Sequence, residues 1–154
     1  MSRAFVKEGD SASGEPLAEL QLSPHRNLVT AEGLAQIEAH VERLRGELSA
    51  ARSAEDRAAI QRIQRDLRYW SERQRTAEQV GRAAPGGKVR FGATVWLEQS
   101  NGVTVGYRIV GEDEAAPAEG KISYVSPIAR ALIGKDVGDV VMLREGRAEI
   151  VEIK

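Results

Sequence analysis

The sequence predicts an α+β protein, in which an antiparallel helical hairpin is followed by a small antiparallel sheet with one short helix. Over residues 30–82 apolar side chains recur every three or four positions and no proline interrupts them, which is the pattern of amphipathic helices. From residue 88 onward apolar and polar residues alternate in short runs divided by glycine-containing turns, which is typical of strands. The 154 residues suffice for two small structural units.

Composition divides the chain into three segments. Residues 1–27 combine scattered apolar residues with Gly, Ser and Pro. We expect a mobile N-terminal tail there, because such a stretch buries too little apolar surface to offset its ordering entropy. Residues 28–82 form the predicted helical hairpin, a coiled coil. An Ala-Ala-Pro-Gly-Gly run breaks the helical pattern at its end, and residues 83–154 form the predicted globular domain.

Each arm of the hairpin has a capping residue and an apolar seam. Thr30 is the expected N-cap of the first helix and Ser53 that of the second, with Asp56 three residues later. The link near 49–53 is too short for anything but an antiparallel pair. About 20 residues per arm give a rod of ~30 Å that needs a domain at its open end. Both seams have coiled-coil spacing and comprise Leu34, Ile37, Val41, Leu44 and Leu48 in the first arm and Ile60, Ile63, Leu67 and Trp70 in the second.

The globular segment predicts about five strands and one short helix. Asn101-Gly102 is a strong signal for a hairpin turn between the first two strands. Ser126 and Pro127 have the residue types of an N-cap and a first helical position, and Gly134 suits the position just after the helix. The strands are expected at 89–97, 103–110, 121–125, 139–143 and 148–153. The expected buried stripe of the helix is Ile128, Leu132 and Ile133.

Composition excludes several classes of function. The 22 basic and 23 acidic residues balance, so the total charge predicts no strong nonspecific attraction to nucleic acid. Cysteine is absent and His25 and His40 lack a ligand-like spacing, so we expect no metal or cofactor held by the chain itself. No catalytic triad, phosphate-binding loop or zinc-protease motif occurs. No apolar signal region or membrane-length apolar run is present, which favours a cytoplasmic protein.

Charged residues give three candidate groups. Glu55 and Asp56 lie at the expected tip, where they either offset the helix dipole or present carboxylates to a metal held by a partner. The acidic run 111–114 is expected to be a solvated turn, with a metal site as the less favoured interpretation. Arginines on the second arm form either a solvated face or a partial basic surface for a nucleic-acid end or an acidic protein wall. They are Arg57, Arg62, Arg65, Arg68, Arg73 and Arg75.

Several stretches resemble the GreA/GreB family of transcription elongation factors. The likeness covers about residues 28–154. The stretches that resemble the family's C-terminal domain are KVRFGATVWL at 88–97, YRIVGEDEA at 107–115, ISYVSPIARALIGKDVGDVV at 122–141 and IVEIK at 150–154. Those that resemble its N-terminal coiled coil are VTAEGL at 29–34 and RYWSERQRTAEQV at 68–80. The opening SRAFVKE resembles a GreB-like subgroup with an added N-terminal tail.

The resemblance implies a helical hairpin joined to an FKBP-like α+β domain. In this family the globular domain docks at the mouth of the RNA polymerase secondary channel. The hairpin enters the channel, where tip acids help to hold a catalytic Mg²⁺ for hydrolysis of backtracked RNA. Bacterial RNA polymerase is therefore the implied partner, with the RNA 3′ end or DNA of the elongation complex as a further contact and no membrane. We expect a monomer, because the seam is satisfied within the hairpin. The implied docking residues are Val125, Ser126, Pro127, Ile128 and Arg130.

The chain departs from the family at the tip, where the family's acidic run is replaced by LSAARSAEDRAA at 48–59. Matching both ends of the hairpin leaves each arm about nine residues short, which is ~13 Å of helix. Mg²⁺ needs oxygen ligands at ~2.1 Å, so side-chain rotation cannot cover that shortfall. The sequence therefore predicts a polymerase-binding regulator without an active site of its own. The alternative is a true transcript-cleavage factor acting through Glu55 and Asp56 on polymerase-held Mg²⁺.

Two other classes of function stay open. An FKBP-like sheet suggests prolyl isomerisation, but fold alone does not give function, and an aromatic content of 5% argues against an aromatic-lined pocket. A nucleic-acid-binding hairpin independent of polymerase would bind free RNA or DNA in a salt-sensitive way, which the balanced charge does not favour.

Overall fold

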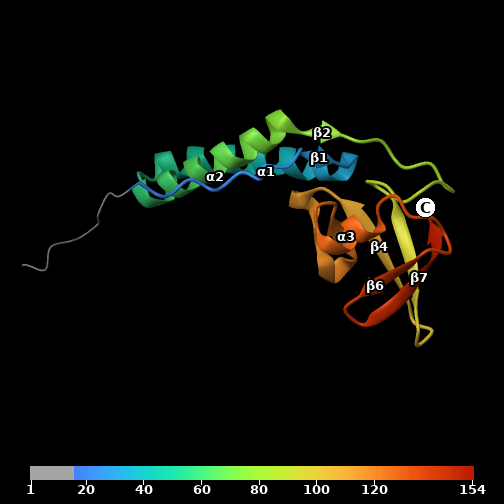
Figure 1. Ribbon diagram of the computed structural model, residues 1–154. Helices are drawn as coiled ribbons and strands as arrows, with labels where there is room; N and C mark the ends of the chain where they lie inside the picture. The colour runs from blue at the N-terminus through green and yellow to red at the C-terminus, as the bar shows by residue number, and fades with distance from the viewer. Residues whose placement is uncertain (1–15) are drawn as a thin grey trace, which may run out of the picture.

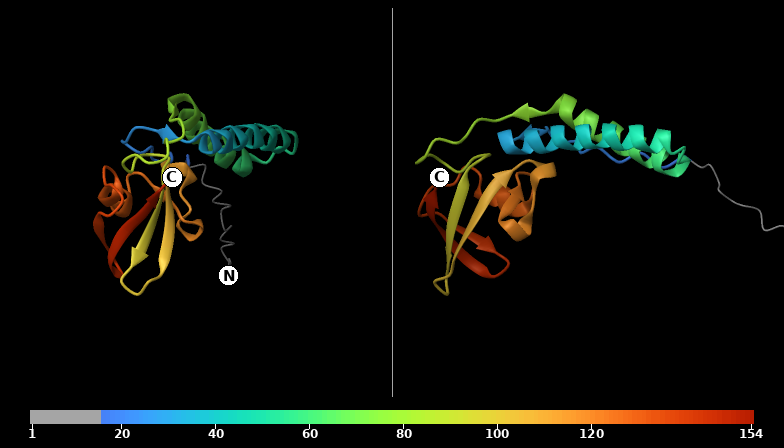
Figure 2. Two further views of the ribbon diagram at one scale, coloured as in Figure 1. Left: turned by 90° about the vertical axis from the view of Figure 1, so that its right-hand side faces the viewer. Right: turned by 180° about the vertical axis from the view of Figure 1, so that it is seen from behind.

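The computed structural model describes residues 16–154, which form two units joined at one end (Figure 1). A helical rod projects from a small curled sheet, and the views from the side and from behind show the same projection (Figure 2). The rod is therefore not folded back over the sheet. This arrangement confirms the predicted order of a helical hairpin followed by an α+β domain.

The rod consists of α1 (Ala31–Ser53) and α2 (Arg57–Thr76), with 23 and 20 residues. At ~1.5 Å per residue the longer arm measures ~35 Å, close to the predicted length. Thr30 is the N-cap of α1, as predicted, because its hydroxyl accepts a hydrogen bond from the Gly33 N–H at 2.9 Å. The seam also matches the prediction, and its buried members are Ile37, Val41, Leu44, Leu48, Ala51 and Ile63. Ile60, Leu67 and Trp70 pack against them from α2.

The link between the helices differs from the prediction. Ser53 is the last residue of α1 rather than the N-cap of α2, and Asp56 takes that role by accepting from the Ala59 N–H at 3.0 Å. The Glu55 and Asp56 N–H groups donate back to the Arg52 and Ala51 carbonyls, which is a Schellman ending with Glu55 in the left-handed region at φ 54°. The sequence did not reveal this ending because it usually contains glycine, and none is present here.

We expect Asp56→Ala to lower the free energy of unfolding by about 1 kcal/mol, because it leaves an N-terminal amide of α2 without its acceptor. Asp56→Asn keeps an oxygen acceptor and should change stability by much less. Urea unfolding followed by circular dichroism at helix wavelengths compares the two. Equal losses in both variants would show that charge, not capping, is the contribution of this residue.

The base of the rod is held by a short parallel pairing of β1 (Leu28–Val29) with β2 (Glu78–Gln79). Leu28 faces Glu78 in this register, so the chain goes into the hairpin and leaves it at neighbouring positions. The Glu78 N–H donates to the Asn27 carbonyl at 2.8 Å, and the Val80 N–H donates to the Val29 carbonyl at 2.9 Å. Neither strand was predicted, because each has only two residues.

The globular domain is one five-stranded sheet in the order β5-β4-β3-β7-β6. Neighbouring strands are antiparallel except β4 and β5, which pair parallel; the prediction of a wholly antiparallel sheet is wrong at that edge. Two 3-10 turns, η1 (Glu112–Glu114) and η2 (Pro117–Glu119), make the crossover that a parallel neighbour requires. The strands are β3 (Thr94–Gln99), β4 (Thr104–Val110), β5 (Lys121–Ser123), β6 (Val140–Leu143) and β7 (Gly146–Ile153).

The first strand begins later than predicted, at Thr94. Burial alternates from Val89 onward as the sequence suggested, but Gly92 has φ 84° and turns the chain before the ladder starts. The turn at Asn101-Gly102 connects β3 and β4 as predicted, with Gly102 at φ 81°.

The single helix of the domain, α3 (Pro127–Leu132), covers the core of the sheet. Ser126 caps it and Gly134 follows it at φ 85°, both as predicted. The expected stripe is wrong in one member, because the helix ends at Leu132 and Ile133 is 40% exposed. Ala129 is fully buried in its place.

Candidate functional site

The tip of the rod carries both predicted carboxylates. Glu55 and Asp56 are exposed and lie in the link between α1 and α2. Their chemical settings differ. One Asp56 oxygen, Oδ1, is engaged by the Ala59 N–H, so this side chain has a structural role in capping. The Glu55 side chain has no hydrogen-bond partner among residues 16–154, and its backbone occupies the left-handed region.

The arginines of α2 do not form one face. At 100° per residue, Arg57 and Arg68 lie on one side of the helix, while Arg62 and Arg65 are turned about 80–140° away from Arg57. Arg65 pairs with Asp66 at 2.8 Å and Arg68 with Glu19 at 2.5 Å. Among residues 16–154, no carboxylate lies within salt-bridge range of Arg57 or Arg62.

Arg73 is not a surface residue. Its side chain is 4% exposed, and its Nε lies 2.5 Å from Oδ2 of Asp113. It therefore belongs to the junction between the rod and the sheet, and its role there is structural. Arg75 is exposed and pairs with Glu72 one turn earlier.

The predicted docking segment lies where β5 leads into α3. Pro127 and Arg130 are exposed, while Val125, Ser126 and Ile128 are half-buried. The segment is held firmly, because the Ser126 N–H donates to the Ser123 carbonyl at 2.9 Å and the neighbouring Tyr124 ring packs edge-on against Phe91. The Tyr124 hydroxyl donates to the backbone carbonyl of Arg26. A fixed loop thus presents one proline and one arginine to the exterior.

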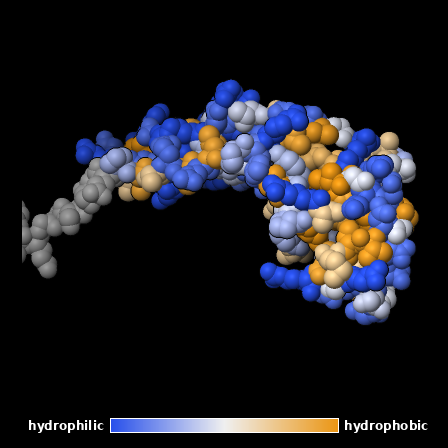
Figure 3. All heavy atoms as spheres, viewed as in Figure 1, coloured by the Kyte–Doolittle hydropathy of each residue, from blue (hydrophilic) through white to orange (hydrophobic). Residues whose placement is uncertain are grey.

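Exposed apolar side chains follow α3 along the chain, and sequence reasoning missed them as a surface. Figure 3 shows hydrophobic residues gathered on the globular domain, whereas the rod is mostly hydrophilic. Met142 is 69% exposed on the edge strand β6. The exposed members are Ile133, Val137, Val140 and Met142. Period-2 alternation could have identified Val140 and Met142, which lie on the opposite face of β6 from buried Val141.

The acidic run 111–114 is not a solvated turn, which corrects the prediction. Its last residue, Glu114, is 6% exposed and accepts a hydrogen bond from the Thr30 hydroxyl at 2.5 Å, above the N-terminus of α1. A Cβ on Gly33 would lie 2.6 Å from the same carboxylate, so any larger residue at that position of the helix would force the Glu114 side chain to move. Asp113 accepts from Tyr69 at 2.8 Å and from Arg73. These acids join the rod to the sheet.

Burial and the hydrogen bond to Asp113 raise the pKa of Tyr69 to about 12. An unfolded tyrosine ionises near pH ~10, whereas folded Tyr69 stays protonated to higher pH. The contribution of protonated Tyr69 to folding stability is therefore fully present below pH ~10 and is lost as the pH rises towards 12. We expect the phenolate absorbance of the protein to show a transition near pH 12 that Tyr69→Phe removes. Identical titration curves for the two proteins would contradict this assignment.

The described residues show no other chemical site. Between residues 16 and 154, no three His, Asp or Glu side chains come together in a way that could hold a metal ion. None of the helices in this part of the chain is both long enough and apolar enough to cross a membrane. The surface groups available for function are therefore the docking segment, the apolar residues beside it and the rod.

Comparison with known proteins identifies the globular domain. Residues 84–154 match the family model described as "Transcription elongation factor, GreA/GreB, C-term". Transcription elongation factor GreA of Methylococcus capsulatus is 59% identical over 66 residues, which are 42% of each chain. Transcription elongation factor GreB of Haemophilus influenzae is 62% identical over 55 residues, which are 36% of this chain and 35% of that protein. The chain thus matches less than half the length of these relatives.

Solved structures give a weaker likeness over a longer stretch. The GreA factor homolog 1 (Gfh1) of Thermus thermophilus is 21% identical and covers 84% of this chain and 99% of its own, with a TM-score of 0.41. The factor GreA/GreB from Nitrosomonas europaea is 20% identical, also with a TM-score of 0.41, and covers 84% of this chain and 98% of its own. The assignment therefore depends on the sequence matches of the globular domain. The globular domain, residues 84–154, is thus a GreA/GreB-type C-terminal domain.

Proposed function

We propose that the chain is an RNA polymerase-binding regulator of transcription elongation, which docks through its globular domain and inserts a short hairpin into the secondary channel. It acts in the cytoplasm as a monomer and holds no cofactor of its own. The observation that carries this proposal is the projection of the rod from a domain of this family whose Ser126–Pro127 helix start is intact and partly exposed. In this proposal, the bound chain alters pausing or initiation by RNA polymerase, or the access of competing factors to its secondary channel.

The tip supports a regulator more than a cleavage factor. One oxygen of Asp56 is used in capping, and the arms have only 23 and 20 residues. In the cleavage alternative, Glu55 and the second Asp56 oxygen would offer ligands to a Mg²⁺ held by the polymerase. Carboxylate oxygens suit that ion, but Mg²⁺ binds its ligands only at short distance. A tip that ends short of the ion therefore cannot coordinate it.

Docking is tested with purified bacterial RNA polymerase and the full chain in a pull-down at two salt concentrations. Arg130→Glu reverses an exposed charge at α3, and we expect it to reduce retention at least ten-fold. Lys154→Glu makes the same charge change on an exposed residue at the C-terminus and should bind normally. Absence of binding by the unaltered chain would overturn the proposal, as would equal losses in both variants.

Cleavage is tested on stalled, backtracked elongation complexes. Glu55→Gln with Asp56→Asn removes both charges while keeping an oxygen N-cap for α2, so folding should be preserved. We expect no release of short RNA 3′ fragments with either protein. Fragment release by the unaltered chain that disappears in the double variant would establish the alternative instead.

A further inference from the structure

An extended segment, residues 16–27, runs alongside α2 and touches both units of the protein (Figure 1). We name it the N-terminal strap. At its C-terminal end, the Asn27 side chain is buried and donates to the Arg73 carbonyl at 2.7 Å, and the Ser23 hydroxyl donates to Glu112 at 2.9 Å. These contacts fix the strap at the junction. The expectation of a mobile tail over 1–27 stays a prediction, and residues 1–15 lie outside the described part.

Farther along the rod, the strap is held by one ion pair. Arg68 Nε lies 3.1 and 3.0 Å from the two carboxylate oxygens of Glu19, and a terminal nitrogen of Arg68 lies 2.5 Å from Oε1. This is the bidentate arrangement with which a guanidinium also binds a phosphate. Both side chains are more than half exposed, so the pair is in contact with water and other anions can compete for it.

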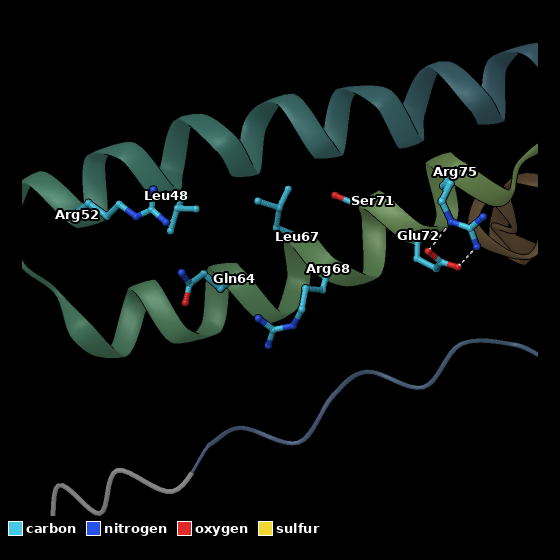
Figure 4. A pocket seen from close by; sticks show the side chains of 8 residues that line it. All are labelled: Leu48, Arg52, Gln64, Leu67, Arg68, Ser71, Glu72 and Arg75. Atoms are coloured by element: carbon cyan, nitrogen blue, oxygen red, sulfur yellow. Dashed lines mark hydrogen bonds and ion pairs between the residues drawn. The ribbon is translucent and has the colours of Figure 1, made fainter.

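Arg68 belongs to a line of arginines on the outer side of α2. Arg57, Arg68 and Arg75 are eleven and seven positions apart, which places them within about 20° of one another around the helix. We name these three residues the arginine stripe; its guanidinium groups are spread over ~27 Å of helix. Beside it, an open groove of about 690 Å³ lies between the helices, with Leu48 and Leu67 among its lining residues (Figure 4).

We propose that the N-terminal strap competes with single-stranded nucleic acid for the arginine stripe, with the Glu19 carboxylate standing where a phosphate would bind Arg68. The linear spacing of guanidinium groups fits a flexible polyanion, and the half-buried Leu67 at the groove gives the bases an apolar contact. This inference rests on the proposed function in one respect, because the nucleic acid would come from the elongation complex into which the hairpin is inserted.

The test measures binding of the full chain to a labelled single-stranded RNA by fluorescence anisotropy. Glu19→Gln should raise affinity about three-fold at low salt, because one surface ion pair no longer competes, and the gain should vanish at high salt. Adding Arg68→Gln should abolish the gain. Glu47→Gln is the matched control, since it removes the same charge and frees Arg43 on α1, outside the stripe. Amide hydrogen exchange over residues 17–22 should quicken when RNA is added.

Equal gains in RNA affinity from Glu19→Gln and Glu47→Gln would show that the effect comes from net charge alone, and would overturn the proposal. So would a gain that survives the loss of Arg68. If RNA binding is unchanged while Glu19→Gln increases retention by polymerase, the stripe meets an acidic protein surface and the nucleic-acid proposal is wrong. The polymerase pull-down with unaltered chain is run in parallel, so a failure of docking is seen separately from a failure of strap release.

Discussion

Replacing Arg73 by methionine should lower the free energy of unfolding by about 3–5 kcal/mol, because it leaves the Asp113 carboxylate buried without its cation. The side chains of Arg73 and Asp113 are 4% and 12% exposed, so water cannot replace the lost partner. Such a loss is a large part of the total stability of a small protein. Urea unfolding followed by tryptophan fluorescence measures it.

The two tryptophans make this experiment specific to the junction. Trp70 lies on α2 in the rod and Trp96 lies on β3 in the sheet, so Trp96→Phe and Trp70→Phe backgrounds report one unit each. We expect one shared transition with Arg73 present and two separated transitions in Arg73→Met. The double variant with Asp113→Asn should be less destabilised than the sum of the single changes. A loss below about 1 kcal/mol would show that the pair contributes little.

Gly111→Ala should open the same junction by steric conflict. A Cβ at Gly111 would lie 2.4 Å from the carbonyl oxygen of Leu28 in β1, and no rotamer change can relieve a clash between two backbones. Gly111 has φ −70°, so the glycine is required by close approach and not by its conformation. We expect a loss of about 3 kcal/mol, at the upper end for overpacking, measured by thermal and urea unfolding.

Gly46→Ala is the control for that change. Gly46 lies in α1, and no atom beyond its chain neighbours and the adjacent helix backbone lies within 4 Å of the place that an alanine methyl would take. Alanine there should therefore stabilise the helix by about 0.5–1 kcal/mol. Opposite signs for the two glycine substitutions would support the close approach at the junction. Equal, small effects would show that β1 can shift without cost.

The sequence predicted the rod and the sheet because both depend on local periodicity. The heptad spacing from Ile37 to Leu48 requires a partner helix, and the alternation around Val95 requires a sheet with one buried face. The start of α3 was predicted because Ser126 and Pro127 mark a helix start by residue type alone. Docking through this segment stays a prediction from the family resemblance.

The junction could not be predicted in the same way. Arg73 and Asp113 are 40 positions apart, and each has the appearance of a surface charge in its own segment. Only the fold brings them together, so the sequence favoured a solvated loop and a basic face. The parallel edge strand was missed for a similar reason, since β5 has three residues and its direction is set by the 3-10 turns before it.

The pairing of Leu28 with Glu78 has one further consequence. Since both ends of the hairpin are fastened beside each other at the base, its far end can change length without disturbing the globular domain. Adding seven residues to each arm beside the link would extend it by ~10 Å and keep the apolar contacts in phase, whereas four residues in one arm would rotate them apart. The length of the hairpin and its attachment to the globular domain can thus be changed independently of each other, by selection or by design.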